Sequence, residues 1–362
     1  MKLLIAGGGT GGHVFPALAV AEELKSRDAN HEVLFVGTET GFEAKIIPQK
    51  NFPLKTIPRT PLVGLSLKDK IKSLSKLREA VSASKKIIEE FKPDAILGVG
   101  GYASAPAVYA GYKKKKKTFL LEQNAVPGIT NRILSYIADY VFVSFESTKN
   151  YFPKQDCELT GNPVRKEFLN VASQKIAKKE EDPFCLFIMG GSQGAHIINI
   201  TVIEALPLFK ELPHKLKIIH QTGKEDFEMV KKEYAEKGVS AEIFTFAPDM
   251  AEYLKRADIV VGRAGAGTVS ELIVTQTPSI LIPYTYAKSH QIYNAKELEK
   301  KGAARIVAQQ DLSEEKLFNI IKQMMTYPQA LEKMKEALVG FRWGSPAEKI
   351  VNFMISHGLQ TS

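Results

Sequence analysis

The feature that most constrains the fold is a strand-like apolar run that leads directly into a glycine-rich turn and then into a helical pattern, and it occurs twice. Leu3–Ala6 leads into Gly7–Gly12, and Phe184–Met189 leads into Gly190–Gly194. A strand, a glycine turn and a helix in this order open a Rossmann-like domain. Two such openings about 180 residues apart predict two doubly wound α/β domains with parallel sheets, which we expect to face each other across a cleft.

The rest of the chain alternates between short strand-like runs and longer helical patterns. Further strand-like runs are Val33–Val36, Ala95–Val99, Thr118–Leu121, Tyr140–Val143, Leu216–His220, Glu242–Phe246, Ile259–Val261 and Ser279–Ile282. Helical patterns cover Phe15–Ser26, Leu67–Glu90 and Asn294–Lys301. This alternation is typical of parallel sheets with helices on both faces. We place the boundary in the turn-forming cluster Thr160–Pro163, which gives domains of residues 1–163 and 164–340.

Composition and charge restrict the classes of protein. No apolar stretch reaches the ~20 residues of a membrane-spanning helix, and the first residues lack the pattern of a signal peptide. Cys157 and Cys185 stand outside any metal-ligand spacing, as expected for reduced thiols in a cytosolic protein. The net charge is +9, and the first 163 residues hold 23 basic and 16 acidic side chains against 26 and 24 in the rest. The first half therefore has an anionic partner: a phosphate-rich ligand, nucleic acid or anionic lipid.

A third glycine turn, Gly98–Ser104, follows another strand-like run. Backbone N–H groups in such turns, together with the N-terminus of the next helix, attract anions. All three turns fall at the carboxyl ends of expected parallel strands, where open α/β sheets bind ligands. We therefore expect the turns to bind a phosphorylated ligand, and favour this over glycines that serve only tight strand-to-helix packing. The sequence contains no P-loop, and Glu39 comes too late after the second strand for a nicotinamide enzyme.

Six motifs in a specific order identify a family. They are Gly8–Pro16, Gly100–Ser104, Glu122–Asn124, Gly161–Arg165, Gly190–Ala195 and Arg263–Glu271. In sequence and spacing they resemble the MurG family of GT-B glycosyltransferases, which add N-acetylglucosamine to undecaprenyl-diphospho-muramoyl-pentapeptide (lipid I) and so form lipid II for peptidoglycan. The resemblance also implies that a C-terminal helix within 341–362 packs back on the N-terminal domain. That domain would bind the acceptor and face the membrane, and the second domain would bind UDP-N-acetylglucosamine.

The resemblance implies a role for each matching residue of the donor site. Glu271 would accept hydrogen bonds from both ribose hydroxyls, as suits a carboxylate beside a vicinal diol, and the backbone of Ala247 would read the uracil. Ser192 would bind the diphosphate, with Arg165 opposing its charge, and Gln291 would hold sugar hydroxyls. The stretch beneath the nucleotide sugar would be Ala266, Gly267, Thr268, Val269, Ser270 and Glu271. The residues approaching the sugar from the N-terminal domain would be Thr10, Gly11, Gly12 and Asn124.

The resemblance further implies an inverting, single-step transfer without a metal ion or cofactor. The attacking 4-hydroxyl must lose a proton, and His13 is the candidate base because the unperturbed pKa of histidine is near 6.5. Without the family, His13 would be expected only to cap a helix or to hydrogen-bond a backbone carbonyl, and Glu271 to be a first-turn glutamate favoured by the helix dipole. Tyr102 and Glu122 either contact the acceptor or brace loops.

Two basic segments are candidates for membrane contact. Lys113–Lys117 is a run of five lysines that is either a solvated turn or a lipid-facing surface, and we favour the second. In Leu65–Leu74 an apolar stripe is flanked by lysines, which suits a membrane-facing helix or a core-facing one equally. We therefore expect a peripheral protein at the cytoplasmic face of the cell membrane. The alternatives are a UDP-N-acetylglucosamine 2-epimerase and a transferase that makes glycolipids. Nucleic acid is not an expected partner, because no basic stretch is interleaved with aromatic residues.

Overall fold

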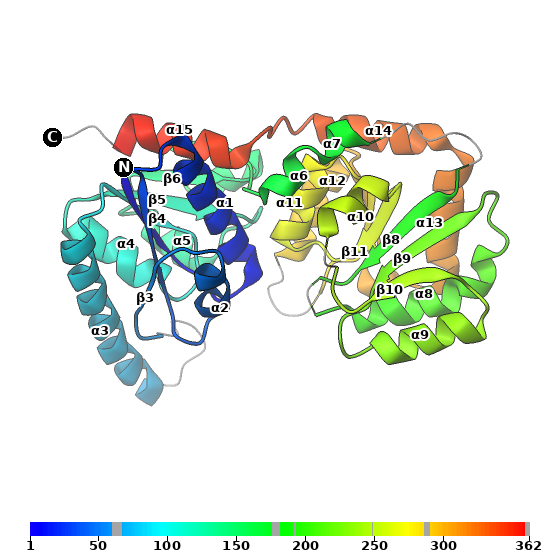
Figure 1. Cartoon of the computed structure of the whole chain (residues 1–362), viewed down its shortest axis with the longest axis horizontal. Coiled ribbons are helices and arrows are strands. Elements are labelled where there is room, and N and C mark those ends of the chain that lie inside the picture. The colour runs from blue at the N-terminus through cyan, green and yellow to red at the C-terminus, as the bar shows by residue number, and fades with distance from the viewer. Residues whose placement is uncertain (60–66, 176–181, 192, 248, 286–289, 359–362) are drawn as a thin grey trace. The chain divides into compact units, whose positions relative to one another are not determined.

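The computed structural model describes residues 1–59, 67–175, 182–191, 193–247, 249–285 and 290–358, with side chains in α3 from residue 75 onward. The chain divides into two compact units (Figure 1). Unit 1 is Met1–Arg165 with Ser345–Ser362, and unit 2 is Lys166–Gly344. The division falls two residues after the expected boundary at Pro163. Within the described residues, no helix is long and apolar enough to cross a membrane.

Unit 1 contains one parallel sheet in the order β3-β2-β1-β4-β5-β6-β7. Its strands are β1 (Lys2–Ala6), β2 (Glu32–Gly37), β3 (Leu54–Thr56), β4 (Ala95–Gly98), β5 (Lys117–Glu122), β6 (Tyr140–Val143) and β7 (Cys157–Leu159). Its helices are α1 (Gly11–Arg27), α2 (Phe42–Gln49), α3 (Leu67–Phe91), α4 (Ser104–Lys113), α5 (Ile129–Leu134), the 3-10 helix η1 (Glu146–Tyr151) and α15 (Pro346–Gly358).

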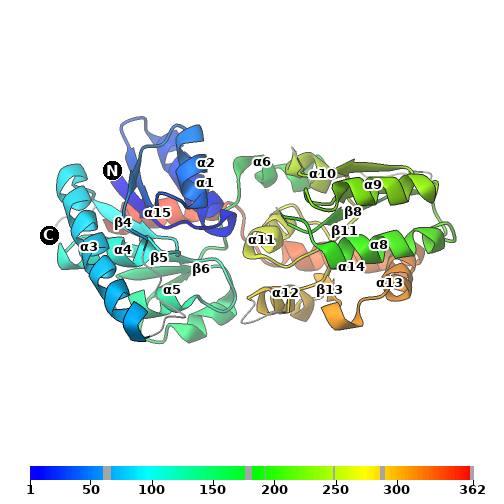
Figure 2. The same cartoon turned by 90° about the horizontal axis from the view of Figure 1, so that it is seen from below.

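Side-chain alternation along β1 builds a core on each face of this sheet. Leu3 and Ile5 point into one core with α1, α2 and α15, and Leu4 and Ala6 point into the other with α3 and α4. Helix α15 supplies Ile350, Val351 and Met354 to the first core. It lies beside α1, as Figures 1 and 2 show from two directions.

Unit 2 repeats the plan with a parallel sheet in the order β10-β9-β8-β11-β12-β13. Its strands are β8 (Phe184–Met189), β9 (Leu216–Gln221), β10 (Ala241–Phe244), β11 (Ile259–Gly262), β12 (Ser279–Leu281) and β13 (Ala304–Ile306). Its helices are α6 (Lys166–Leu169), α7 (Val171–Gln174), α8 (His196–Phe209), α9 (Phe227–Glu236), α10 (Met250–Arg256), α11 (Ala266–Val274), α12 (Gln291–Lys300), the 3-10 helix η2 (Gln309–Asp311), α13 (Glu314–Thr326) and α14 (Pro328–Val339). Two of these helices have side-chain caps: Asp249 accepts from the amide of Glu252 at the start of α10, and Ser313 accepts from that of Lys316 at the start of α13.

The expected pair of doubly wound parallel-sheet domains is confirmed, and the strand order explains where each site forms. In unit 1 the order reverses between β1 and β4, where Ala6 pairs with Gly98. In unit 2 it reverses between β8 and β11, where Met189 pairs with Gly262. Each reversal is the switch point at which open α/β sheets bind ligands. The loops that follow the two paired strands therefore begin side by side in both units.

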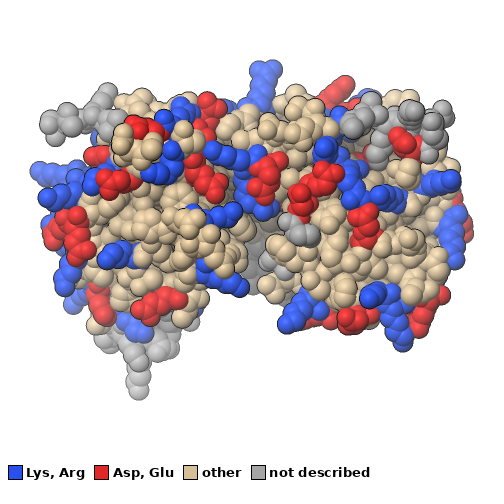
Figure 3. Space-filling model, viewed as in Figure 1, with Lys and Arg blue, Asp and Glu red and all other residues tan. Residues whose placement is uncertain are grey.

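On the face shown in Figure 3, lysine and arginine side chains are mixed with aspartate and glutamate over both units. Among the described residues on this face, the basic side chains of unit 1 therefore stand beside acidic ones.

Candidate functional site

In unit 1 the glycine turn after β1 is interlocked with the turn after β4. The amide of Gly8 donates to the carbonyl of Gly100 at 3.2 Å. A Cβ on Gly7 would lie 2.3 Å from the Gly100 oxygen, and one on Gly101, where φ is +81°, would lie 2.3 Å from the Gly8 oxygen. Neither position has room for a side chain, so glycine is required for the two backbones to touch.

The buried carboxylate of Glu43 fixes the outer end of the first turn. Glu43 is 2% exposed on α2. Its Oε2 accepts from the amide of Gly9 at 2.6 Å, and its Oε1 accepts from the amide and the hydroxyl of Thr38 at 2.9 and 2.8 Å. A Cβ on Gly8 or Gly41 would lie 2.2 or 2.1 Å from this carboxylate, and one on Gly37 would lie 2.4 Å from Cγ of the same side chain. Glu43 therefore connects the loops after β1 and β2, and the sequence gives no signal for this role because it depends on a long-range contact.

Helix α1 begins at Gly11, four residues earlier than the expected Phe15. The carbonyl of Thr10 accepts from the amides of His13 and Val14, so Gly11 and Gly12 form the first helical turn. The amides of Gly11 and Gly12 precede these bonds and have no carbonyl to bind within the helix. The side chain of Thr10 makes no capping hydrogen bond to the helix, and Thr10 and Gly12 are exposed. This turn can therefore receive a polar or anionic group.

His13 lies in that first helical turn and is half-buried. Its Nδ1 lies 3.0 Å from the carbonyl oxygen of Gly8, and a carbonyl only accepts, so in the neutral ring Nδ1 carries the proton and Nε2 is the basic atom. A Cβ on Gly100 would lie 2.9 Å from Nε2. The glycine turn after β4 therefore leaves room for the basic atom of the ring.

The loop after β5 is braced by Glu122, which is 2% exposed. Its carboxylate accepts from the backbone and side-chain amides of Asn124 at 3.0 and 3.1 Å. It also accepts from the amide of Gly128 at 3.1 Å and from Nδ2 of Asn131 at 2.9 Å. Of the two roles left open for Glu122, the structure supports bracing of loops. The ring of Tyr102 faces a cation, since the Arg59 guanidinium lies 4.5 Å from its centre.

Arg165 is the last residue of the first stretch of unit 1. Its guanidinium lies 5.3 Å from the ring centre of Phe15 on α1, and that ring packs edge to face on Phe42. Arg165 is therefore held close to the helix that carries His13.

In unit 2 the glycine turn after β8 packs on the carboxyl end of β9. A Cβ on Gly190 would lie 2.1 Å from the amide nitrogen of Ala195, and one on Gly194 would lie 2.0 Å from the Thr222 carbonyl oxygen. Nε2 of Gln221 donates to the Gly191 carbonyl at 3.1 Å. Helix α8 follows directly, so its N-terminus faces the turn. Ser192, expected to bind the diphosphate, lies outside the described residues.

The loop after β11 leads into α11 and is open to a ligand. The helix begins at Ala266, and Gly267 and Thr268 lie in its first turn. No atom lies within 4 Å of the position that a Cβ on Gly267 would occupy. Val269 and Ser270 are buried, and the Ser270 hydroxyl donates to the Ala266 carbonyl at 2.6 Å.

Glu271 is the sixth residue of α11 and is partly exposed. The interpretation of Glu271 as a first-turn glutamate is therefore wrong, because the helix begins at Ala266 and the residue falls in its second turn. Stabilisation by the helix dipole is confined to the first turn and does not account for this carboxylate.

Gln291 and Ala247 lie near the carboxyl ends of other strands of unit 2. Gln291 is the first residue of α12, and its Oε1 accepts from the amides of Tyr284 and Ala264 at 2.9 and 3.4 Å. These bonds tie α12 to the loops after β11 and β12. Ala247 is buried in the loop between β10 and α10.

The structure brings some of the predicted residues together in each unit, but Ala247 follows β10, which β9 separates from β8. His13, Thr10, Gly11 and Gly12 lie beside the Gly100 turn, whereas Ala266, Glu271, Gln291 and the Gly190–Gly194 turn follow adjacent strands in unit 2. Within the described residues, no group of three or more His, Cys, Asp or Glu side chains could hold a metal ion.

Two doubly wound units with glycine turns at their switch points define the class as the GT-B fold of nucleotide-sugar enzymes. The crystal structure of Acinetobacter baumannii MurG is similar, with a TM-score of 0.81 and 29% identity over 98% of this chain and 99% of that one. A UDP-GlcNAc 2-epimerase from Neisseria meningitidis, solved with UDP-GlcNAc bound, has a TM-score of 0.67 at 14% identity over 99% of this chain and all of that one. The second likeness shows a shared fold only.

Sequence relatives narrow the class to a family. Residues 3–143 match the N-terminal domain of glycosyltransferase family 28, and residues 185–350 match its C-terminal domain. A Geobacter sulfurreducens protein is 44% identical over 98% of both chains, and one from Myxococcus xanthus is 42% identical over 93% of this chain and 88% of that one. Both are named UDP-N-acetylglucosamine–N-acetylmuramyl-(pentapeptide) pyrophosphoryl-undecaprenol N-acetylglucosamine transferase. The chain belongs to glycosyltransferase family 28.

Proposed function

We propose that this protein transfers N-acetylglucosamine from UDP-N-acetylglucosamine to the 4-hydroxyl of lipid I, which gives lipid II for peptidoglycan synthesis. The observation that carries the proposal is the 44% identity to a transferase of this name over 98% of both chains. The two glycine-turn sites support it, because donor and acceptor both contain a diphosphate.

The donor would bind to unit 2. The turn Gly190–Gly194 and the N-terminus of α8 suit the diphosphate, since backbone amides and a helix N-terminus attract anions. Ala247 would present its backbone to the uracil, and Glu271 would accept the ribose hydroxyls. Gln291, whose Oε1 accepts from two backbone amides, would hold sugar hydroxyls.

The acceptor would bind to unit 1, where His13 is the proposed base. As the acceptor 4-oxygen attacks the anomeric carbon, its proton passes to Nε2 of His13 and the bond from that carbon to the UDP oxygen breaks. Displacement from the opposite side inverts the anomeric centre. Hydrogen bonds from the helix N-termini and the charge of Arg165 would stabilise the departing UDP without a metal ion, and the sequence contains no Asp-x-Asp motif.

The test is transfer of labelled N-acetylglucosamine by the purified protein to lipid I. The expected result is lipid II formed in equal amount with UDP, at the same rate with and without a chelator. Donor incubated alone should yield neither the manno epimer nor free UDP. Epimer formation, or transfer to diacylglycerol in place of lipid I, would overturn the proposal.

We also propose that unit 1 binds the cytoplasmic face of the cell membrane as a peripheral protein through the run Lys113–Lys117. Lys113 lies 5.6 and 5.8 Å from the ring centres of Tyr109 and Tyr112, which are 40% and 45% exposed. Exposed tyrosines beside lysines suit a membrane interface, where amphipathic rings sit at headgroup level. Lys114 and Lys117, however, pair with Glu89 and Asp139, so the other three lysines would provide most of the attraction. The apolar stripe of 65–74 lies outside the described side chains.

Substitution of Lys113, Lys115 and Lys116 by glutamine tests this surface while keeping both ion pairs. Each basic residue near an anionic leaflet contributes about 1 kcal/mol, so binding to vesicles containing anionic lipid should weaken at least tenfold, with unchanged turnover on a short water-soluble acceptor. The matched control replaces the exposed Lys210, Lys215 and Lys333 of unit 2 by glutamine. Equal weakening in both variants would show that only the net charge matters.

A further inference from the structure

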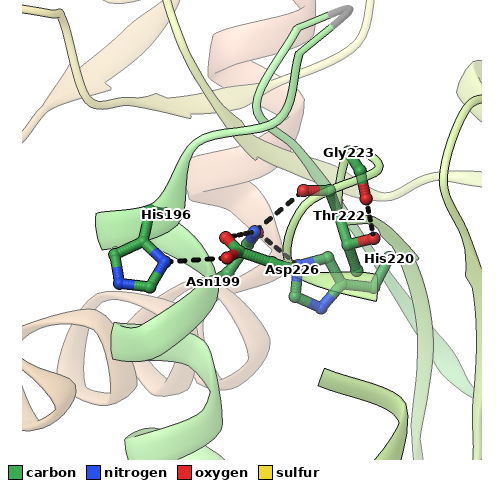
Figure 4. A network of polar contacts seen from close by, with 6 residues as sticks. All are labelled: His196, Asn199, His220, Thr222, Gly223 and Asp226. Atoms are coloured by element: carbon green, nitrogen blue, oxygen red, sulfur yellow. Dashed lines mark hydrogen bonds and ion pairs between the residues drawn. The ribbon is translucent and has the colours of Figure 1, made fainter. Parts of the chain in front are cut away.

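A chain of polar side chains links α8, β9 and the loop after β9 in unit 2 (Figure 4). Its members are Asn199 of α8, His220 of β9, Tyr234 of α9 and the half-buried carboxylate of Asp226, whose Oδ1 pairs with the exposed His196, and we call it the Asn199 network. Figure 4 draws all of these side chains except Tyr234. Asn199 and His220 are fully buried and Tyr234 is 1% exposed. Buried polar groups are costly unless each has a partner, so their presence together at one place requires an explanation.

Every hydrogen bond of the central carboxamide is accounted for. Nδ2 of Asn199 donates to the Thr222 carbonyl at 2.9 Å and to Oδ2 of Asp226 at 2.7 Å. Its Oδ1 accepts from Nε2 of His220 at 3.0 Å, which leaves Nδ1 of His220 to accept from the Tyr234 hydroxyl at 3.0 Å. Burial lowers the pKa of His220 to about 3, so the ring is neutral and this direction of bonds is the one that satisfies all four groups.

The network ends on the backbone that supports the glycine turn. The Thr222 carbonyl that Asn199 holds is the atom that a Cβ on Gly194 would meet at 2.0 Å, and a Cβ on Gly223 would lie 2.2 Å from the Gln193 carbonyl oxygen. The segment Thr222–Gly223 is therefore in contact with Gln193–Gly194 without space for one carbon atom between them. A shift of the Thr222 carbonyl must move the turn.

We propose that Asn199 is a positioning residue for the donor diphosphate, acting through the Thr222 carbonyl on the described part of the glycine turn, Gly190, Gly191, Gln193 and Gly194. The inference rests on the proposed function, in which that turn holds the diphosphate. A fully satisfied buried network specifies one geometry, and anion binding by backbone amides depends on their orientation, so a displacement of the turn weakens it. In the same proposal uridine would be held by other loops of unit 2 and would not touch the turn.

The test compares the affinities of UDP and uridine for the wild-type protein and Asn199→Asp. In this variant an acceptor oxygen faces the Thr222 carbonyl and Asp226, so two attractive contacts become repulsive without a change in side-chain size. The dissociation constant of UDP should rise at least tenfold, the effect of about 1.4 kcal/mol, while that of uridine stays within about twofold. A structural role alone would weaken both ligands equally or neither, and either result overturns the proposal.

Two further variants keep the test decisive. Tyr234→Phe removes only the hydroxyl at the far end of the network and should weaken UDP about threefold relative to uridine; it decides the question if Asn199→Asp does not fold, and an unchanged ratio overturns the proposal. Ser84→Ala is the control, because it deletes a buried hydrogen bond to the Ala80 carbonyl within α3 of unit 1, and it should leave the UDP-to-uridine ratio unchanged. Failure of the wild-type protein to bind UDP would instead refute the donor assignment itself.

Discussion

Replacing Glu43 by glutamine should loosen the first glycine turn without changing the shape of the side chain. The carboxylate accepts from three donors, namely the amides of Gly9 and Thr38 and the Thr38 hydroxyl. A carboxamide has one acceptor oxygen, so in either orientation its NH₂ group faces one of the two backbone amides. The Thr38 hydroxyl can rotate to accept, but a backbone amide cannot.

The cost follows from these contacts. One buried amide left without a partner costs about 1–3 kcal/mol, and the remaining bonds lose the strengthening that a charged acceptor gives, about 0.5–1 kcal/mol each. Unit 1 should therefore lose about 2–5 kcal/mol of stability. The turn that carries Gly9 and Thr10 should also open more often, which would lower turnover by misplacing His13.

Amide hydrogen exchange followed by mass spectrometry measures both effects. Peptides from β1 and β4 report the opening of unit 1 as a whole, and a peptide covering residues 7–15 reports the turn. Glu39→Gln is the matched control, since Glu39 is exposed in the same loop as Thr38 and should leave exchange and turnover unchanged. If Glu43→Gln exchanged like the wild-type protein in all three peptides, the argument that Glu43 holds the turn would be refuted.

Three further predictions concern the chemistry and the pH dependence. His13→Gln can still donate to the Gly8 carbonyl but cannot take a proton, so turnover should fall by about 10²–10⁴ with the donor KM within about threefold; steady-state kinetics that show unchanged turnover would remove His13 from the mechanism. Glu271→Gln should raise the donor KM at least tenfold and spare the KM for lipid I, and a normal donor KM would exclude the ribose contact. Burial lowers the pKa of His220 to about 3, below the 6.5 of the unfolded chain. The unfolded state then binds the extra proton between these pH values, so unit 2 should lose about 1.4 kcal/mol per pH unit as the pH falls below 6.5. The free energy of unfolding of His220→Gln, measured by denaturation at pH 5 and pH 7, should lack this part of the pH dependence. An equal pH dependence in the variant and the wild-type protein would contradict the conclusion that His220 is buried in its neutral form.

Much of the fold could be predicted because long parallel strands have strong local patterns. Tyr140–Val143 and Phe184–Met189 have the predicted bounds, and α3 ends within one residue of its prediction. The sequence analysis missed β3, β7 and β13, which lie at sheet edges and have three residues each. A short strand with one neighbour needs no continuous apolar run, so its position depends on the sheet beside it.

The candidate site was predictable only where a residue type itself carries the chemistry. Glycine turns and a histidine after a strand are visible in the sequence, and the structure places them together. Glu43 and Asn199 are not visible in this way, because each acts on residues from 5 to 34 positions away. Their roles follow from which strands become neighbours, and no local pattern encodes that.

The return of α15 to unit 1 has a consequence for synthesis of the chain. Ile350, Val351 and Met354 complete a core that begins with Leu3 and Ile5, so the first unit to leave the ribosome is the last to be finished. Until α15 emerges, the helix that carries His13 has one apolar flank exposed to water. Domains usually fold in the order in which they are translated. In this chain, however, every residue of unit 2 is translated before the final helix of unit 1. A released chain truncated after Gly344, which contains all of unit 2 but lacks α15, should therefore hold a protease-resistant unit 2 and a protease-sensitive unit 1.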